Sequence, residues 1–231
     1  MMKIFFAILL LVSVSAIEVP EVKVSGAMKN IMMQGDLSAH INLDTLNKTH
    51  LFGLGPAAGL KGEIMILDGK VYSTAMQENK LLNQQDKISQ AAMLVYSHVE
   101  KWSPVIRKVK INNYADLEKL IEATALDKGY DIEIPFAFKI ETTPVKTTYH
   151  VIDWKEGTAH TMENHKQFAH SGQIDKTPTV LVGFYSKYHQ SIFTHHTTFM
   201  HIHLLEEKSK TVGHLDDIQL KAQITIYLSE K

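Results

Sequence analysis

The sequence predicts an α/β fold of the α+β kind. A mixed sheet with helices is expected to precede a mostly antiparallel β region that carries a metal site. Three observations support this: apolar residues recur at helical spacing in the first half, strand patterns dominate from residue 133 onward, and three histidines gather near the C-terminus. The 231 residues are enough to bury a sizeable core.

The first 16 residues have the pattern of a secretory signal peptide. Lys3 precedes an apolar run from Ile4 to Val14, which is too short to span a bilayer, and small residues up to Ala16 suit cleavage. We expect cleavage after Ala16 and a secreted or periplasmic mature chain that begins near Ile17 and has no membrane attachment. A short membrane anchor is the alternative.

Residues 17–128 are expected to form an α/β domain. Apolar residues at helical spacing predict helices over residues 25–33, 86–98 and 115–126. Asp68-Gly69 within residues 62–74 is a strong turn signal for a hairpin, and alternation over residues 105–110 predicts a further strand.

Residues 129–231 are expected to form a β-rich metal-binding domain. Strand patterns cover residues 134–141, 147–153, 179–185, 197–205, 211–215 and 222–228. Residues 164–178 form the longest predicted loop, and long loops often carry function.

Three histidines have the spacing of a metal site on a hairpin. His201 and His203 point to the same side of a strand, and a returning strand after the polar turn brings His214 to meet them. Three imidazoles are the protein ligands of many catalytic metal sites and leave one position open. The chain has 13 histidines, so chance pairing is the simpler alternative, and His195 shares the parity of the pair but lies farther away.

Composition narrows the classes of partner and ligand. A formal net charge of −1 gives no basis for nucleic-acid binding, which needs a clustered basic face. The chain contains no cysteine, so it forms no disulfide and lacks the thiol of a lipoprotein anchor. Nitrogen and oxygen ligands must therefore hold any metal, which suits zinc or another first-row ion.

Several short motifs occur together in a characteristic order. They are Gly35-Asp36, Phe52-Gly53-Leu54-Gly55, Gly59-Leu60-Lys61-Gly62-Glu63, Leu67-Asp68-Gly69-Lys70, Gly183-Phe184, the His201/His203 pair and Gly213-His214. In this order the chain resembles the α-acetolactate decarboxylases over most of its mature length.

The resemblance implies a Zn²⁺ enzyme that converts 2-acetolactate, a 2-hydroxy-3-oxo acid, to acetoin and carbon dioxide. It implies metal ligands at His201, His203 and His214, a catalytic carboxylate at Glu63, and a homodimer. Zinc acts on such an acid as a Lewis acid, while a positioned acid reprotonates the product. The alternative for Glu63 is a surface residue at the start of a hairpin strand.

Some positions depart from the family pattern. Lys139 stands where the resemblance places an active-site arginine, so we expect it to be a catalytic residue that anchors the substrate carboxylate. Lysine cannot make the planar, bidentate contact of a guanidinium. Arg107 is the single arginine of the sequence, and Pro56 replaces a threonine. The family also has an acidic residue in a tail beyond the last strand, for which Glu230 is the available substitute.

Two alternatives remain open. His201-x-His203-x3-Glu207 followed by Gly213 loosely resembles the first motif of a cupin-like metal protein. A secreted metal-binding protein that kept the decarboxylase fold without its activity is the other alternative, because Lys139, Pro56 and the short tail depart from the family. An acetoin assay with and without chelator separates the enzyme from this second alternative.

Overall fold

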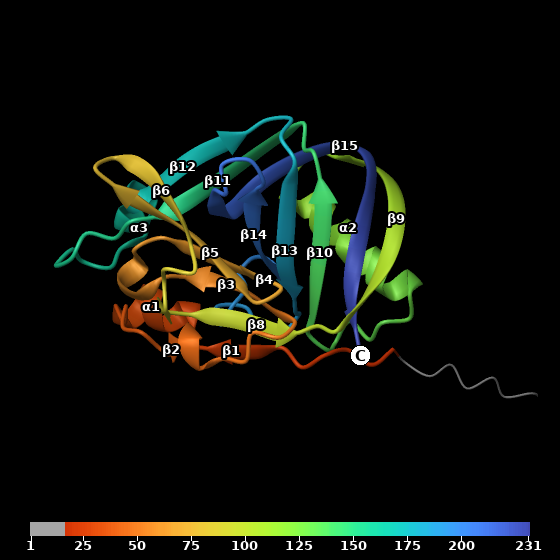
Figure 1. The fold of residues 1–231 in the computed structure, drawn as a ribbon, viewed down its shortest axis with the longest axis horizontal. Coiled ribbons are helices and arrows are strands. Elements are labelled where there is room, and N and C mark those ends of the chain that lie inside the picture. The colour runs from red at the N-terminus through yellow and green to blue at the C-terminus, as the bar shows by residue number, and fades with distance from the viewer. Residues whose placement is uncertain (1–16) are drawn as a thin grey trace, which may run out of the picture.

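The computed structural model describes residues 17–231, so the predicted signal peptide lies outside the described residues. Figure 1 shows two antiparallel sheets built largely from successive halves of the chain. The first sheet has the strand order β1 (Lys23–Ser25), β8 (Leu94–His98), β3 (Leu51–Pro56), β4 (Glu63–Leu67), β5 (Lys70–Gln77) and β6 (Lys80–Gln85). A separate pair joins β2 (Ile41–Asn42) to β7 (Gln90–Ala91).

The second sheet has seven strands and is partly closed on itself. Its order is β10 (Phe136–Thr142), β13 (Thr179–Tyr185), β14 (Met200–Glu206), β15 (Val212–Glu230), β11 (Lys146–Ile152) and β12 (Ala169–Ile174), with β9 (Lys101–Ile111) along β15. The start of β15 pairs with β14 and its end pairs with β10, so these strands and β13 form a ring.

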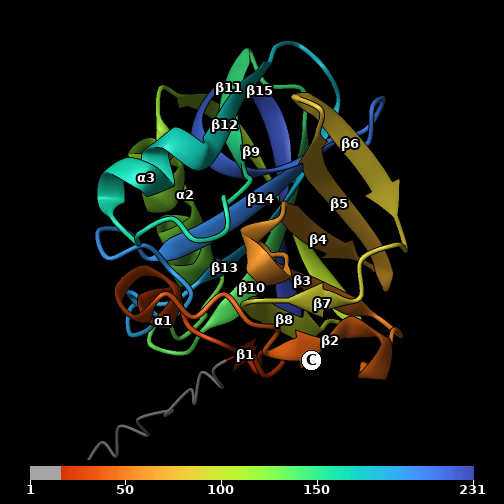
Figure 2. The same ribbon diagram turned by 90° about the vertical axis from the view of Figure 1, so that its left-hand side faces the viewer.

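Helices cover the sheets on two sides. They are α1 (Met28–Gln34), α2 (Tyr114–Asp127) and α3 (Met162–Phe168), with short 3-10 turns η1 (Leu43–Thr45) and η2 (Ala58–Leu60). Leu117, Ile121 and Ala125 of α2 are buried in one core with the second sheet. Figure 2 shows α1 and α3 together on another side of the molecule.

A second core joins the two sheets face to face. Leu54 and Met65 of the first sheet pack in it with Val182 and Phe184 of the second, and all four are fully buried. Burying such side chains stabilises the fold by roughly 1.5–3 kcal/mol each. The packing brings β4 of the first sheet against β14 and β15 of the second.

The α+β class is confirmed, and so are most predicted elements. The helix at residues 115–126 is α2, whose N-cap is Asn113, and the hairpin at residues 62–74 is β4 and β5. Every ladder between strands in the described part of the chain is antiparallel, so the expected mixed sheet does not form.

Three predicted elements are wrong. Residues 86–98 form β7 and β8 instead of a helix. All residues from Ala91 to Val95 are buried, so the spacing of apolar residues in this run does not distinguish a helix from a strand. The predicted loop at 164–178 contains most of α3 and all of β12. The two strands predicted at 211–215 and 222–228 are one continuous strand, β15.

The change from the first sheet to the second falls between His98 and Lys101, earlier than the predicted domain boundary at residues 127–130. Strand β9 and helix α2 thus belong with the second sheet. Whether either half of the chain is an independent domain stays a prediction. In the part of the chain from residue 17 onward, no helix is long and apolar enough to cross a membrane.

Gly62 fixes the start of β4, and its replacement is expected to destabilise the fold. Its φ is +123°, and a Cβ would lie 2.3 Å from the Thr74 carbonyl oxygen. Gly129 has a φ of +82° but no atom within 4 Å of a built Cβ, so it is the matched control for backbone strain alone. We expect Gly62→Ala to cost about 3 kcal/mol or more and Gly129→Ala about 1 kcal/mol in urea unfolding. Equal losses would contradict the close approach.

Candidate metal centre

The structure brings the three predicted histidines together. His201 and His203 alternate with apolar residues on β14, and His203 lies directly opposite His214 on β15. One ring nitrogen from each lies within 4.8 Å of the others, and Nε2 of His201 is 3.1 Å from Nδ1 of His214. His201 and His203 are buried, whereas His214 is partly exposed. The group therefore has the spacing needed to surround one ion.

A hydrogen bond between the two sheets orients His203. Its Nδ1 donates to the Ile64 carbonyl oxygen on β4 at 2.8 Å, since a carbonyl can only accept. Nε2 of His203 therefore carries the free lone pair, and this buried atom has no hydrogen-bond partner. Buried polar atoms without partners are rare, and this one suits coordination of a cation. In His201 it is Nε2 that faces the group, and Nδ1 is the buried nitrogen without a partner.

Burial keeps the three imidazoles neutral. It is the main cause that lowers the pKa of His201, His203 and His214 well below the ordinary value, and the charges of neighbouring histidines act in the same direction. Neutral imidazoles can offer lone pairs at neutral pH. An all-nitrogen set of this kind fits zinc or another first-row divalent ion.

Glu63 lies beside the histidines. It is the first residue of β4 and is buried, with Oε2 3.5 Å from Nε2 of His203. Oε1 accepts a hydrogen bond from the Ile152 amide at 3.4 Å. Burial raises the pKa of the Glu63 carboxyl to about 7, although the charge of His150 and the Ile152 amide act in the opposite direction. Glu63 can therefore gain or release a proton near neutral pH.

The structure adds His150 and Asp216, which the sequence did not single out. Nδ1 of His150 lies 2.7 Å from Oδ1 of Asp216, and its ring centroid is 4.7 Å from that of His214. Burial lowers the pKa of His150, but the hydrogen bond and charge of Asp216 outweigh it, so the net shift is upward. Asp216 is an extra residue at a β-bulge, and bulges at functional sites redirect side chains. His150 and Asp216 come together because β11 pairs with β15, and local sequence patterns do not predict which strands pair.

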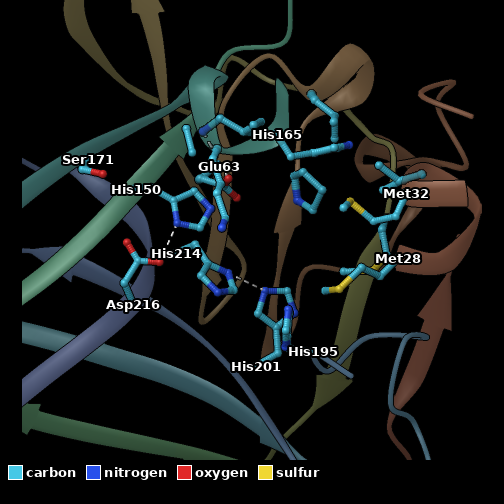
Figure 3. Close-up of a pocket in the computed structure, with 17 residues that line it drawn as sticks. Met28, Met32, Glu63, His150, His165, Ser171, His195, His201, His214 and Asp216 are labelled. Carbon is cyan, nitrogen blue, oxygen red and sulfur yellow. Dashed lines mark hydrogen bonds and ion pairs between the residues drawn. The ribbon is translucent and has the colours of Figure 1, made fainter. Parts of the chain in front are cut away.

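A cavity of about 500 Å³ opens onto this group. His201, His214 and Glu63 line its polar side together with His150 and Asp216. Figure 3 shows Met28 and Met32 across the cavity from His150 and Asp216. The cavity can thus admit a small molecule to the three imidazoles.

Other residues that the sequence singled out are dispersed. Lys139 bonds to Glu141 at 2.6 Å, lies over the ring of Tyr227 and lines a different cleft, so its position does not support the expected role in the site. Pro56 lines the cavity, as does His195.

Arg107 and Glu230, the possible substitutes for the family's arginine and acidic tail residue, do not line the cavity. Arg107 pairs with Asp127 at 3.0 Å, and Glu230 pairs with Lys101 at 2.7 Å. Glu207 is exposed in the turn after β14, so the cupin-like alternative does not gain its expected ligand.

The fold and site define a two-sheet protein with a buried three-histidine centre at the contact between the sheets. A family model described as alpha-acetolactate decarboxylase matches residues 25–231, and the chain belongs to this family. No curated protein matches the chain.

Solved structures share the fold at low sequence identity. A structure of alpha-acetolactate decarboxylase from Bacillus subtilis strain 168 has 19% identity and a TM-score of 0.73, with 91% of this chain and 85% of that chain covered. Acetolactate decarboxylase from Bacillus subtilis subspecies spizizenii gives 19% identity, a TM-score of 0.74, and coverage of 91% and 86%. A Staphylococcus aureus protein of unknown function, described as similar to alpha-acetolactate decarboxylase, has 15% identity and a TM-score of 0.72, with 91% of this chain and 85% of that chain covered.

We expect the protein to hold close to one divalent ion per chain and His203→Ala to lose it, because three neutral imidazoles converge on one point. His196 is exposed and outside the group, so His196→Ala is the matched control and should keep the ion. Elemental analysis of dialysed protein measures both. Full occupancy in His203→Ala would overturn the assignment of this ligand.

The metal-free protein should lose stability in acid. Below pH of about 6.5 the histidines of the unfolded chain bind protons, whereas their native pKa values lie well below this, so the free energy of unfolding falls as pH falls. Each buried histidine contributes at most about 1.4 kcal/mol per pH unit. The raised pKa of Glu63 acts in the opposite direction between pH 4.5 and about 7.

Comparison with His203→Gln isolates one histidine, since Glu63 remains in both proteins. Urea unfolding with chelator at several pH values should give a shallower dependence for the variant. The same pH dependence for both proteins would show that His203 is not kept neutral by the fold.

Proposed function

We propose that the protein is a zinc-dependent decarboxylase that converts 2-acetolactate to acetoin and carbon dioxide. One observation carries the proposal: the buried carboxyl of Glu63 lies 3.5 Å from a ring nitrogen of the three-histidine group, and Glu63 and two of these histidines line a cavity that can admit a small molecule. Family membership supports a decarboxylase. The homodimer that the resemblance implies stays a prediction.

The reaction needs a place for an electron pair and a proton. The bond between the carboxylate carbon and C2 breaks, carbon dioxide leaves, and the electron pair forms an enediolate that then takes a proton at C2. His201, His203 and His214 would hold the ion, which when bound supplies Lewis acidity toward the substrate oxygen atoms. Three protein ligands leave room for such an interaction.

Glu63 is the residue best placed to move the proton. Its carboxyl lines the cavity beside His203, where it is within reach of a bound substrate and can pass a proton to it or take one from it. The Ile152 amide restrains one carboxyl oxygen, so the other can face the cavity. The His150 ring, which is hydrogen-bonded to Asp216, lines the cavity on the same side as Glu63 and can offer a further N–H group to the substrate.

The non-catalytic metal protein remains the second candidate, and a specific observation favours it. The sequence's single arginine and Lys139 both lie outside the cavity, and the lysine that lines it is Lys166, at another position of the chain. Release of acetoin by the metal-loaded protein, abolished by chelator and restored by zinc, distinguishes the enzyme from a metal carrier.

Glu63→Gln should keep the metal and lose turnover by roughly 10²-fold or more, the usual worth of a positioned acid or base. Lys139→Met is the control for a charge removed outside the cavity, and we expect its acetoin release to stay close to that of the wild type. Rates are compared at equal metal content. An unimpaired Glu63→Gln protein would exclude the carboxyl from proton transfer, and a severe loss in Lys139→Met would restore lysine to the site.

A further inference from the structure

One face of α1 forms an apolar wall of the cavity. Met28, Ile31 and Met32 follow the i, i+3, i+4 spacing of a single helix face, and all three line the cavity. Met33 is the next residue along the helix and is 83% exposed, so it does not share this face. The helix thus directs two methionines toward the cavity and one toward solvent.

Residues from other elements extend the wall. Pro56 ends β3, Leu60 lies in η2, and Met93 precedes β8, and each lines the same cavity. Leu60 and Met93 are almost fully buried. These segments are separate in sequence, so the apolar surface is a product of the fold and not of one hydrophobic run.

The cavity has two chemically different sides. Figure 3 shows His150, Glu63 and His214 on one side and Met28 and Met32 on the other, with His165, His195 and His201 between them. A molecule whose oxygen atoms reach Glu63 and His214 can extend its remaining atoms toward Met28 and Met32. The two methyl groups of 2-acetolactate offer little surface for that contact.

The size of the cavity leads to the same conclusion. Its volume of about 500 Å³ falls in the ~300–1,000 Å³ range of pockets that bury ligands of drug size, which are far larger than 2-acetolactate. Methionine is unbranched and flexible, so it adapts to apolar groups of different shape. The wall is therefore suited to alkyl chains of more than one length.

We propose that the preferred substrates are 2-hydroxy-3-oxo acids with an apolar substituent longer than methyl, seated against Met28, Met32 and Met93. This proposal rests on the function proposed above and specifies the substrate class of the same site. The carboxylate, hydroxyl and keto groups face the histidines and Glu63, while the alkyl chain extends along α1. The chemical step is unchanged, because the added methylene groups take no part in breaking the bond between C2 and the carboxylate carbon.

Binding of unreactive analogues tests the proposal without turnover. In 2,3-dihydroxy-2-methyl acids the ketone is reduced, so they keep the oxygen pattern but cannot decarboxylate. Calorimetry on zinc-loaded protein is expected to show affinity rising roughly two- to fourfold per added methylene over the first few, the worth of burying one CH₂ group. A second series of analogues carries the longer alkyl group at C2 in place of the methyl group, so that chains on both carbon atoms are tested. Constant or falling affinity in both series would overturn the proposal.

A matched pair of variants locates the contact. Met32→Gln keeps an unbranched side chain of similar length but removes apolar surface, and it should flatten the dependence on chain length. Met33→Gln makes the same change on the exposed face and should leave that dependence intact. Equal slopes in wild type and both variants would contradict a contact at Met32.

Turnover of the corresponding keto acids separates the two proposals. The wild type is expected to show kcat/KM increasing from 2-acetolactate to its longer homologues. If no acid releases carbon dioxide, the proposed decarboxylation fails, while the binding series still decides the substrate-binding inference. If 2-acetolactate is turned over fastest and longer acids bind no better, the decarboxylation stands and the inference fails.

Discussion

The site depends on one hydrogen bond between the sheets, from Nδ1 of His203 on β14 to the Ile64 carbonyl on β4. A hydrogen bond of this type contributes a net of only about 1 kcal/mol, but an unpaired buried donor costs more. The bond therefore fixes the ring orientation of His203, while the apolar core holds the two sheets together. Glu63 precedes Ile64 in the same strand, so the same contact places the carboxyl beside His203.

The site is built at the expense of stability. Neutral imidazoles and a carboxyl are removed from water in a core that otherwise joins apolar side chains of two sheets. Nδ1 of His201 and Nε2 of His203 gain no hydrogen bond in return. A cation that binds only the folded chain would offset this cost by mass action. Burial thus keeps the ligand atoms neutral and also makes the fold sensitive to their occupancy.

Local sequence patterns were sufficient to predict the histidine group and several elements. Alternation placed His201 and His203 on one face, and the polar turn after them predicted the return of His214, which lies opposite His203 in the structure. Local patterns also found β13 with its bounds and the helix α2. In each case the residues that decide the geometry lie within one element or one turn.

Features that depend on distant segments were missed or misassigned. All residues from Ala91 to Val95, which run from the end of β7 into β8, are buried, so their apolar spacing mimicked that of a helix. Asp216 reaches His150 through a bulge between β11 and β15, which no local pattern encodes. Lys139 was placed by resemblance alone, and its side chain turns toward Glu141 and Tyr227.

Diffraction from crystals of the zinc-loaded protein, recorded on both sides of the zinc absorption edge, tests whether the three histidines bind the metal. We expect one strong anomalous peak at about 2.0–2.1 Å from a nitrogen of each of His201, His203 and His214, with Nε2 as the ligand atom of His203. Zinc bound elsewhere, or coordination that leaves out His203, would contradict it.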